Sequence, residues 1–249
     1  MRRTVLACAG FALWALPAMA QSADDIIAKY VKAIGGLDKV RAVTTLRRAG
    51  KFIGSGGFEA AVTQENKRAG LVREEFLLQD LTGVNAYDGR TGWKIQPWQG
   101  KKDPEPLGEE EMKSIIEDAD FDGPLVDYQK KGNKVEYVGQ DEVDGTDTYK
   151  LKVALRDDTV LHYYLDAEYY VPIKIDTRRM IRGAEREYET TVGDYKQVAG
   201  WYLPYSYETN AKGSTDKSTI VYDKIEANVP IDDSRFHMPA AAKTQGAKP

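Results

Sequence analysis

The residues best suited to catalysis or metal binding are few and scattered. The chain has two histidines, His162 and His237, which lie far apart and have no partner at a metal-ligand spacing. The serine in 54–57 sits among glycines without forming a G-x-S-x-G elbow, and a hairpin turn explains it better. No phosphate-binding or dinucleotide-binding glycine motif follows a predicted strand. The sequence therefore predicts no metal, no cofactor and no nucleophilic catalysis.

Carboxylates are the only plentiful reactive groups, with 39 Asp and Glu residues in the chain. Asp118, Asp120 and Asp122 alternate in a way that suggests calcium, but the glycine and distal glutamate of an EF-hand loop are missing. A solvated helix exit is the favoured interpretation. A paired-carboxylate enzyme acting on envelope glycans or lipids has no sequence signature, and no pair is singled out. We predict that the protein is not an enzyme, with this class kept as the third alternative.

Charge excludes one class of partner. The 35 basic residues are interspersed with the acidic ones, and the net charge is −4. Nucleic-acid binding requires a basic patch or stripe, which this pattern lacks. We expect no nucleic-acid partner.

The amino terminus has the pattern of a cleavable signal peptide over residues 1–20. Arg2 and Arg3 precede an apolar run that is shorter than the roughly 20 residues of a membrane-spanning helix. The sequence 18–20 (Ala-Met-Ala) then offers a small-x-small cleavage site. The one cysteine, Cys8, would leave with this leader. We therefore predict a disulfide-free periplasmic protein beginning at Gln21.

The elements of the mature chain are mostly strands, flanked by two helices. Helical spacing predicts one helix that begins near Asp24 and ends at Gly35, and another over 108–118. The segment 99–106 is predicted to be a loop, and the Asp88-Gly89 pair a hairpin turn. Even turn spacing predicts a single antiparallel sheet of about ten strands over domain 21–239, followed by a disordered tail over 240–249. The predicted strands are 46–53, 57–64, 71–79, 84–87, 93–98, 134–143, 148–155, 159–166, 171–180, 185–198, 201–208 and 218–227.

Apolar and polar residues alternate along the later strands, so one face of the sheet is apolar. Two helices are too few to cover so wide a face, and the remainder is predicted to form an apolar cleft. The chain is also rich in aromatic residues, with 15 Tyr, six Phe and four Trp, which are core residues or cleft residues. The predicted cleft lining is Leu151, Val153, Leu161, Tyr163, Ile173 and Ile175, with Phe76, Trp93 and Trp201 as aromatic contributors.

An ordered set of short motifs, running through the whole mature chain, resembles the LolA/LolB-like family of periplasmic lipoprotein-sorting proteins. No single motif is specific, and most are hairpin turns. The motifs are Ile34-Gly35-Gly36-Leu37, 87–93 (YDGRTGW), 121–128 (FDGPLVDY), 143–151 (VDGTDTYKL), 163–166 (YYLD), Gly193-Asp194-Tyr195 and 200–204 (GWYLP).

This resemblance implies a mainly β fold: a curved, unclosed antiparallel half-barrel with helices over its concave face. It also implies a non-enzymatic carrier that binds a lipid or the acyl chains of a lipoprotein and delivers it towards the outer membrane. An inner-membrane transporter and an outer-membrane acceptor are the partners such a carrier would need. The alternative within the same fold is a sensor or protein-binding module of the cell envelope.

Overall fold

The computed structural model describes residues 21–240. The expected leader (1–20) and residues 241–249 of the expected tail lie outside the described residues. One antiparallel sheet of 13 strands dominates the described chain, in the order β6-β5-β4-β3-β2-β1-β15-β14-β11-β10-β9-β8-β7. The first half of the sheet is formed by β1 (Thr45–Ile53), β2 (Glu59–Lys67), β3 (Leu71–Leu78), β4 (Leu81–Tyr87), β5 (Gly92–Gln96) and β6 (Lys101–Pro106).

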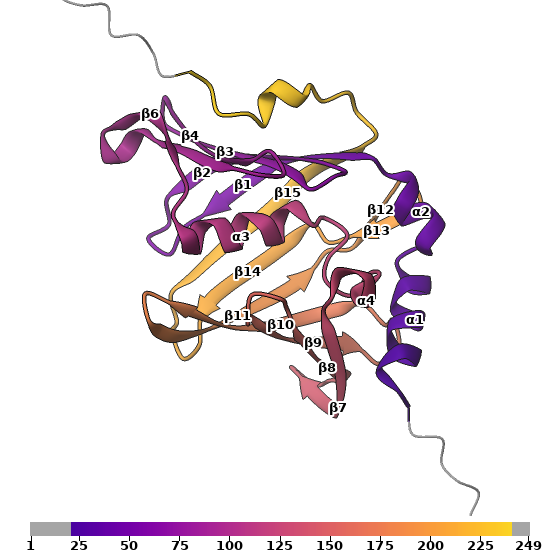
Figure 1. Ribbon diagram of the computed structural model, residues 1–249. Helices are drawn as coiled ribbons and strands as arrows, with labels where there is room; N and C mark the ends of the chain where they lie inside the picture. Colours follow the sequence, from indigo (N-terminus) through magenta and orange to yellow (C-terminus); the bar gives the residue numbers. More distant parts are fainter. Residues whose placement is uncertain (1–20, 241–249) are drawn as a thin grey trace, which may run out of the picture.

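The second half of the sheet is joined to the first through the last strand of the chain. β15 (Lys217–Ala227) pairs antiparallel with β1, with Leu46 opposite Ala227. The two outer strands, β6 and β7, do not pair with each other, so the curved sheet remains open (Figure 1). The predicted fold class is confirmed. The other strands of this half are β7 (Lys134–Val143), β8 (Thr146–Ala154), β9 (Val160–Asp166), β10 (Pro172–Ile181), β11 (Ala184–Gly193) and β14 (Ser206–Ala211).

Within residues 21–240, four α-helices accompany the sheet: α1 (Ala23–Ala33), α2 (Leu37–Ala42), α3 (Glu109–Ala119) and α4 (Tyr128–Lys131). A capping box starts α1, because the Ser22 hydroxyl accepts a hydrogen bond from the Asp25 amide at 3.1 Å. Figure 1 shows α3 lying across the inner side of the sheet, with α1 and α2 along one edge. Both predicted long helices are therefore present.

Gly35 joins the end of α1 to a distant turn of the chain. Its φ of 113° suits glycine, and a Cβ there would meet the Gly200 carbonyl oxygen at 2.1 Å. The Tyr202 amide donates to the Ile34 carbonyl at 2.9 Å next to this approach. Two of the short motifs, around residues 34–37 and 200–204, are thus held against each other.

Several strand predictions differ from the structure. The predicted strand 93–98 ends at Gln96 and is followed by a short 3-10 turn (η1, Pro97–Gln99), and most of the predicted loop 99–106 is the strand β6. Prolines 104 and 106 are tolerated there because β6 is an edge strand that pairs only with β5. The predicted strand 185–198 is divided at Asp194, which turns the chain with a φ of 55°. The predicted strand 201–208 is divided at Pro204 and Tyr205, which belong to neither of its two pieces. The short pieces, β12 (Lys196–Val198) and β13 (Trp201–Leu203), form a separate two-stranded sheet.

The carboxyl-terminal segment covers the convex face of the first half of the sheet. It contains a 3-10 turn, η2 (Asp233–Arg235), followed by Phe236, which is completely buried. Arg235 forms ion pairs with Glu65 of β2 and Glu75 of β3. The first half of the sheet is therefore covered on both faces. None of the helices in residues 21–240 is long and apolar enough to cross a bilayer.

Candidate functional site

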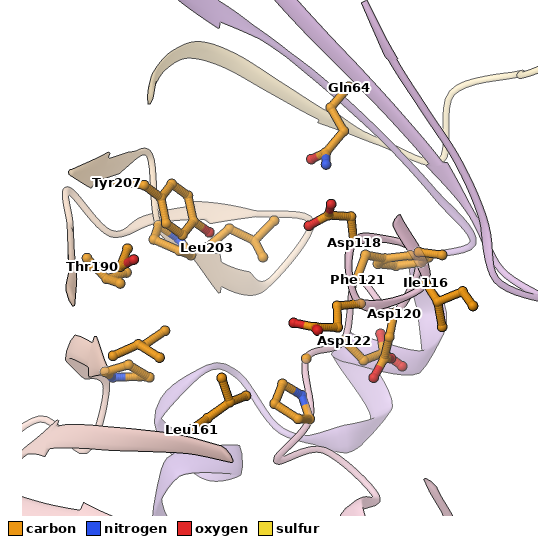
Figure 2. Close-up of a pocket in the computed structure, with 18 of the residues that line it drawn as sticks. Gln64, Ile116, Asp118, Asp120, Phe121, Asp122, Leu161, Thr190, Leu203 and Tyr207 are labelled. Atoms are coloured by element: carbon orange, nitrogen blue, oxygen red, sulfur yellow. The ribbon is translucent and has the colours of Figure 1, made fainter. Parts of the chain in front are cut away.

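A cavity of about 1030 Å³ lies between the concave face of the sheet and the helices (Figure 2). Its volume is at the upper end of the range of about 300–1,000 Å³ that small-molecule sites occupy. Residues from both halves of the sheet, from α3 and from the segment after α3 line it. The two halves contribute walls of different chemistry.

The apolar wall comes from the second half of the sheet and the β13 region. Leu161 and Tyr163 of β9 and Ile175 of β10 line the cavity, with Leu203 and Ile220 further along the wall. Trp201 also lines it, with its ring centroid 6.2 Å from that of Phe121. This wall offers a surface suited to aliphatic chains.

The polar wall comes from the first half of the sheet. We use this name for Arg48 of β1, Gln64 of β2, Glu74 of β3 and Asp118 of α3, all of which line the cavity. The Arg48 guanidinium donates to the side-chain oxygens of Gln64 at 2.8 Å and of Asn66 at 2.6 Å. The Gln64 amide donates in turn to the Glu74 carboxylate at 2.8 Å. The hydrogen-bonded chain fixes the strand side chains of the wall.

The end of α3 brings further carboxylates to the cavity. The Asn66 amide donates to the Asp118 backbone carbonyl at 2.8 Å, which ties the helix end to β2. Figure 2 shows the Asp118 carboxylate extending into the open space between Gln64 and Tyr207. Three neighbouring carboxylates, by contrast, have basic partners: Glu117 with Arg179 at 3.0 Å, Asp120 with Lys131 at 2.6 Å and Asp122 with Arg68 at 2.7 Å.

Desolvation alters the acidity of these groups. The protein surrounding Asp118 raises the pKa of its carboxyl to about 8, and the nearby charge of Glu74 adds to the rise. Desolvation also raises the pKa of Glu74, and it raises that of Glu117 to about 7 against the opposing effect of Arg179. The polar wall thus retains a proton at neutral pH.

Four of the nine predicted lining residues lie on the cavity: Leu161, Tyr163, Ile175 and Trp201. Leu151 and Val153 share their face of the sheet but are completely buried beneath α1, in a cluster with Ile26. These two side chains support the wall and do not contact the cavity.

The other three predicted lining residues lie elsewhere. Trp93 is on the convex face, where its indole N–H donates to the Phe236 carbonyl at 2.7 Å and the ring is buried. Phe76 packs edge-on against Phe52, with ring centroids 5.9 Å apart, outside the cavity lining. Ile173 lies at a β-bulge between β9 and β10, which shifts the alternation and leaves Pro172 on the cavity instead.

Sequence reasoning missed the polar wall. Its strand residues occupy the inward phase of their strands, as the buried neighbours Leu46, Val62 and Val72 do. A polar residue at a position where alternation predicts an apolar one is the signal that would have found them.

Within residues 21–240, no three His, Cys, Asp or Glu side chains gather in a way that could hold a metal ion. His162 of β9 is partly buried, and desolvation lowers its pKa. His237 lies near Asp88, with its Nδ1 3.2 Å from a carboxylate oxygen. The two histidines do not come together.

By sequence, the chain matches no protein-family model and no curated protein. By structure, it is similar to an outer membrane lipoprotein-sorting protein domain from Vibrio parahaemolyticus, with a TM-score of 0.58 and 14% identity over 85% of this chain and 94% of that one. It is also similar to a LolA superfamily protein from Nitrosomonas europaea, with a TM-score of 0.59 and 13% identity over 88% and 98% of the two chains. A DUF1329 family protein from Desulfovibrio piger has a TM-score of 0.57 and 10% identity, over 86% and 96%. The chain therefore has a LolA-like fold.

Proposed function

We propose that this protein is a non-enzymatic periplasmic carrier that binds a lipid, or the acyl chains of a lipoprotein, in the cavity and delivers it towards the outer membrane. The observation that carries the proposal is the open cavity of about 1030 Å³ with an apolar wall. The LolA-like fold and the structural similarity to a lipoprotein-sorting protein domain from Vibrio parahaemolyticus support it. In this proposal residues 1–20 are a leader that directs export, and a membrane transporter and an acceptor supply and receive the cargo.

The apolar wall provides the binding energy in this account. Each methylene of an acyl chain that leaves water contributes roughly 0.8 kcal/mol. A chain of about a dozen carbons along Leu161, Tyr163 and Ile175 would therefore be held firmly. Release then needs either a motion that opens the cavity or an acceptor with a higher affinity.

The alternative is a sensor or protein-binding module that uses the same fold. That function favours a concave face filled by the protein's own side chains. The size of the cavity favours the carrier. A stable protein partner in pull-down experiments, together with no lipid binding, would favour the sensor.

The direct test is the binding of a fluorescent fatty acid to delipidated protein. We expect saturable binding of the probe in the wild-type protein. Ile175→Trp adds bulk at the apolar wall and should reduce the affinity at least about tenfold, because the probe loses burial of two or more methylenes. Met180→Trp is the matched control, since Met180 is exposed on the same strand. No binding to the wild-type protein, or equal binding to both variants, would contradict the proposal.

A further inference from the structure

The polar wall has more acid than its basic partner can neutralise. It contains two carboxylates, Glu74 and Asp118, and one guanidinium, Arg48. The Arg48 guanidinium donates its hydrogen bonds to the neutral side chains of Gln64 and Asn66. Neither carboxylate of the wall has a basic partner at salt-bridge distance in the described chain, although Glu117, Asp120 and Asp122 beside them do.

Asp118 is the member of the wall that is open to a ligand. Only its backbone carbonyl accepts a hydrogen bond within residues 21–240, and its carboxylate oxygens accept none. The side chain is accessible, yet protein surrounds it, because the space that reaches it is the cavity (Figure 2). The charged groups that act on it are Glu74 of β3, Arg48 of β1 and Arg179 of β10.

From this geometry we propose that the polar wall is a subsite for the protonated amine of an amphipathic ligand, whose aliphatic part lies along the apolar wall. The proposal rests on the carrier function and specifies its ligand class. An ammonium group placed at Asp118 would donate hydrogen bonds to carboxylate oxygens that have no partner. The positive charge of the ammonium group would neutralise the one carboxylate of the wall that the charge of Arg48 leaves in excess.

Ligand charge decides which head group the site favours. A carboxylate or phosphate head group would meet the negative charge that the wall keeps, because its two carboxyl groups hold about one proton between them at neutral pH. The Arg48 guanidinium already donates to the amide oxygens of Gln64 and Asn66. A neutral hydroxyl gains no charge-assisted bond. An ammonium group displaces the proton that the wall holds at neutral pH, and that proton passes to the buffer. Binding of an amine should therefore release about one proton per ligand.

The experiment compares three probes of equal chain length on the full mature protein: dodecylamine, dodecanoate and dodecanol. Each displaces a bound fluorescent alkyl probe at pH 7, where dodecylamine carries a positive charge. We expect dodecylamine to bind at least about tenfold more tightly than the other two. Calorimetry in two buffers with different ionisation enthalpies should report proton release for dodecylamine and none for dodecanol.

Asp118→Asn and Glu74→Gln are the test variants, because each removes a charge at nearly constant shape. We expect both to reduce the preference for dodecylamine over dodecanol and to leave dodecanol affinity near the wild-type value. The matched controls are Glu109→Gln, in the first turn of the same helix, and Glu75→Gln, on the other face of the same strand. Neither control should alter the preference, and thermal unfolding checks that all four variants fold.

The outcomes separate the two proposals. If none of the three probes binds, the carrier function fails. If all three bind alike, the carrier function stands and the amine subsite is overturned. A dodecylamine preference that persists in both Asp118→Asn and Glu74→Gln also overturns the subsite, because the preference then arises elsewhere.

Discussion

The two halves of the sheet differ in what their concave faces hold. In the second half, α1 packs on Leu151, Val153 and Leu165, and the contact is dry and apolar. In the first half, Arg48, Gln64 and Glu74 form a hydrogen-bonded chain that lines the cavity, and the end of α3 is tied to β2 beside it. The second half supplies the cavity with aliphatic surface, and the first supplies polar groups. A single fold thereby produces a cavity with two ends suited to an amphipathic molecule.

A substitution in the buried apolar contact between α1 and the second half of the sheet should lower the free energy of unfolding the most. Leu151→Ala removes a completely buried side chain beneath α1, and we expect the free energy of unfolding to fall by about 2–5 kcal/mol. Leu77→Ala on β3 is the control, since that side chain is 46% exposed, and its cost should stay within about 0.5 kcal/mol. Urea unfolding measures both. Equal losses for the two variants would contradict the assigned packing.

The convex face of the first half should affect stability without affecting the cavity. Trp93→Phe leaves the buried Phe236 carbonyl without its donor, so we expect a loss of about 1–3 kcal/mol in unfolding free energy. Fluorescent fatty acid binding should be unchanged, because the indole lies on the face opposite the cavity. A variant of normal stability that no longer binds the probe would place Trp93 in the site after all.

The polar wall should make stability depend on pH. The pKa of Asp118 is about 8 in the folded chain against an ordinary value of 3.8, so the folded state holds the extra proton between these values. The free energy of unfolding should therefore fall as the pH rises from about 4 to about 8 and level off above that. Glu74 and Glu117 act in the same direction, while Arg48 and Arg179 oppose the shift of Asp118.

Asp118→Asn should flatten this dependence. At pH 9 we expect the variant to be more stable than the wild type by about 1–2 kcal/mol, less than the full shift implies because water reaches the carboxylate through the cavity. The advantage should shrink to near zero at pH 4 and below, where the carboxyl is protonated in the folded chain and about half protonated or more in the unfolded chain. Urea unfolding across this pH range measures the difference. A parallel pH dependence in the two proteins would show that Asp118 titrates normally.

The difference between the two halves also explains which features of the fold and of the cavity could be predicted from the sequence. Alternation is regular in β8 and β9, so Leu161 and Tyr163 could be assigned to the concave face from the sequence. Alternation could not predict that α1 buries Leu151, because the position of α1 depends on contacts between residues far apart in the sequence, such as Gly35 and Gly200. In the first half, polar residues at inward positions interrupt the alternation of apolar and polar residues. Trp93 lies on the convex face because its indole contacts the carboxyl-terminal segment, and nothing in the local sequence around Trp93 predicts that contact.

The central claim is that the cavity holds the apolar part of a ligand, and native mass spectrometry of protein purified from its own envelope tests it most directly. We predict a one-to-one adduct with the mass of a lipid or an acylated molecule on the wild-type protein. The adduct should be lost in Ile175→Trp and retained in Met180→Trp. Bare protein in every case, or an adduct that Ile175→Trp keeps in full, would contradict the account.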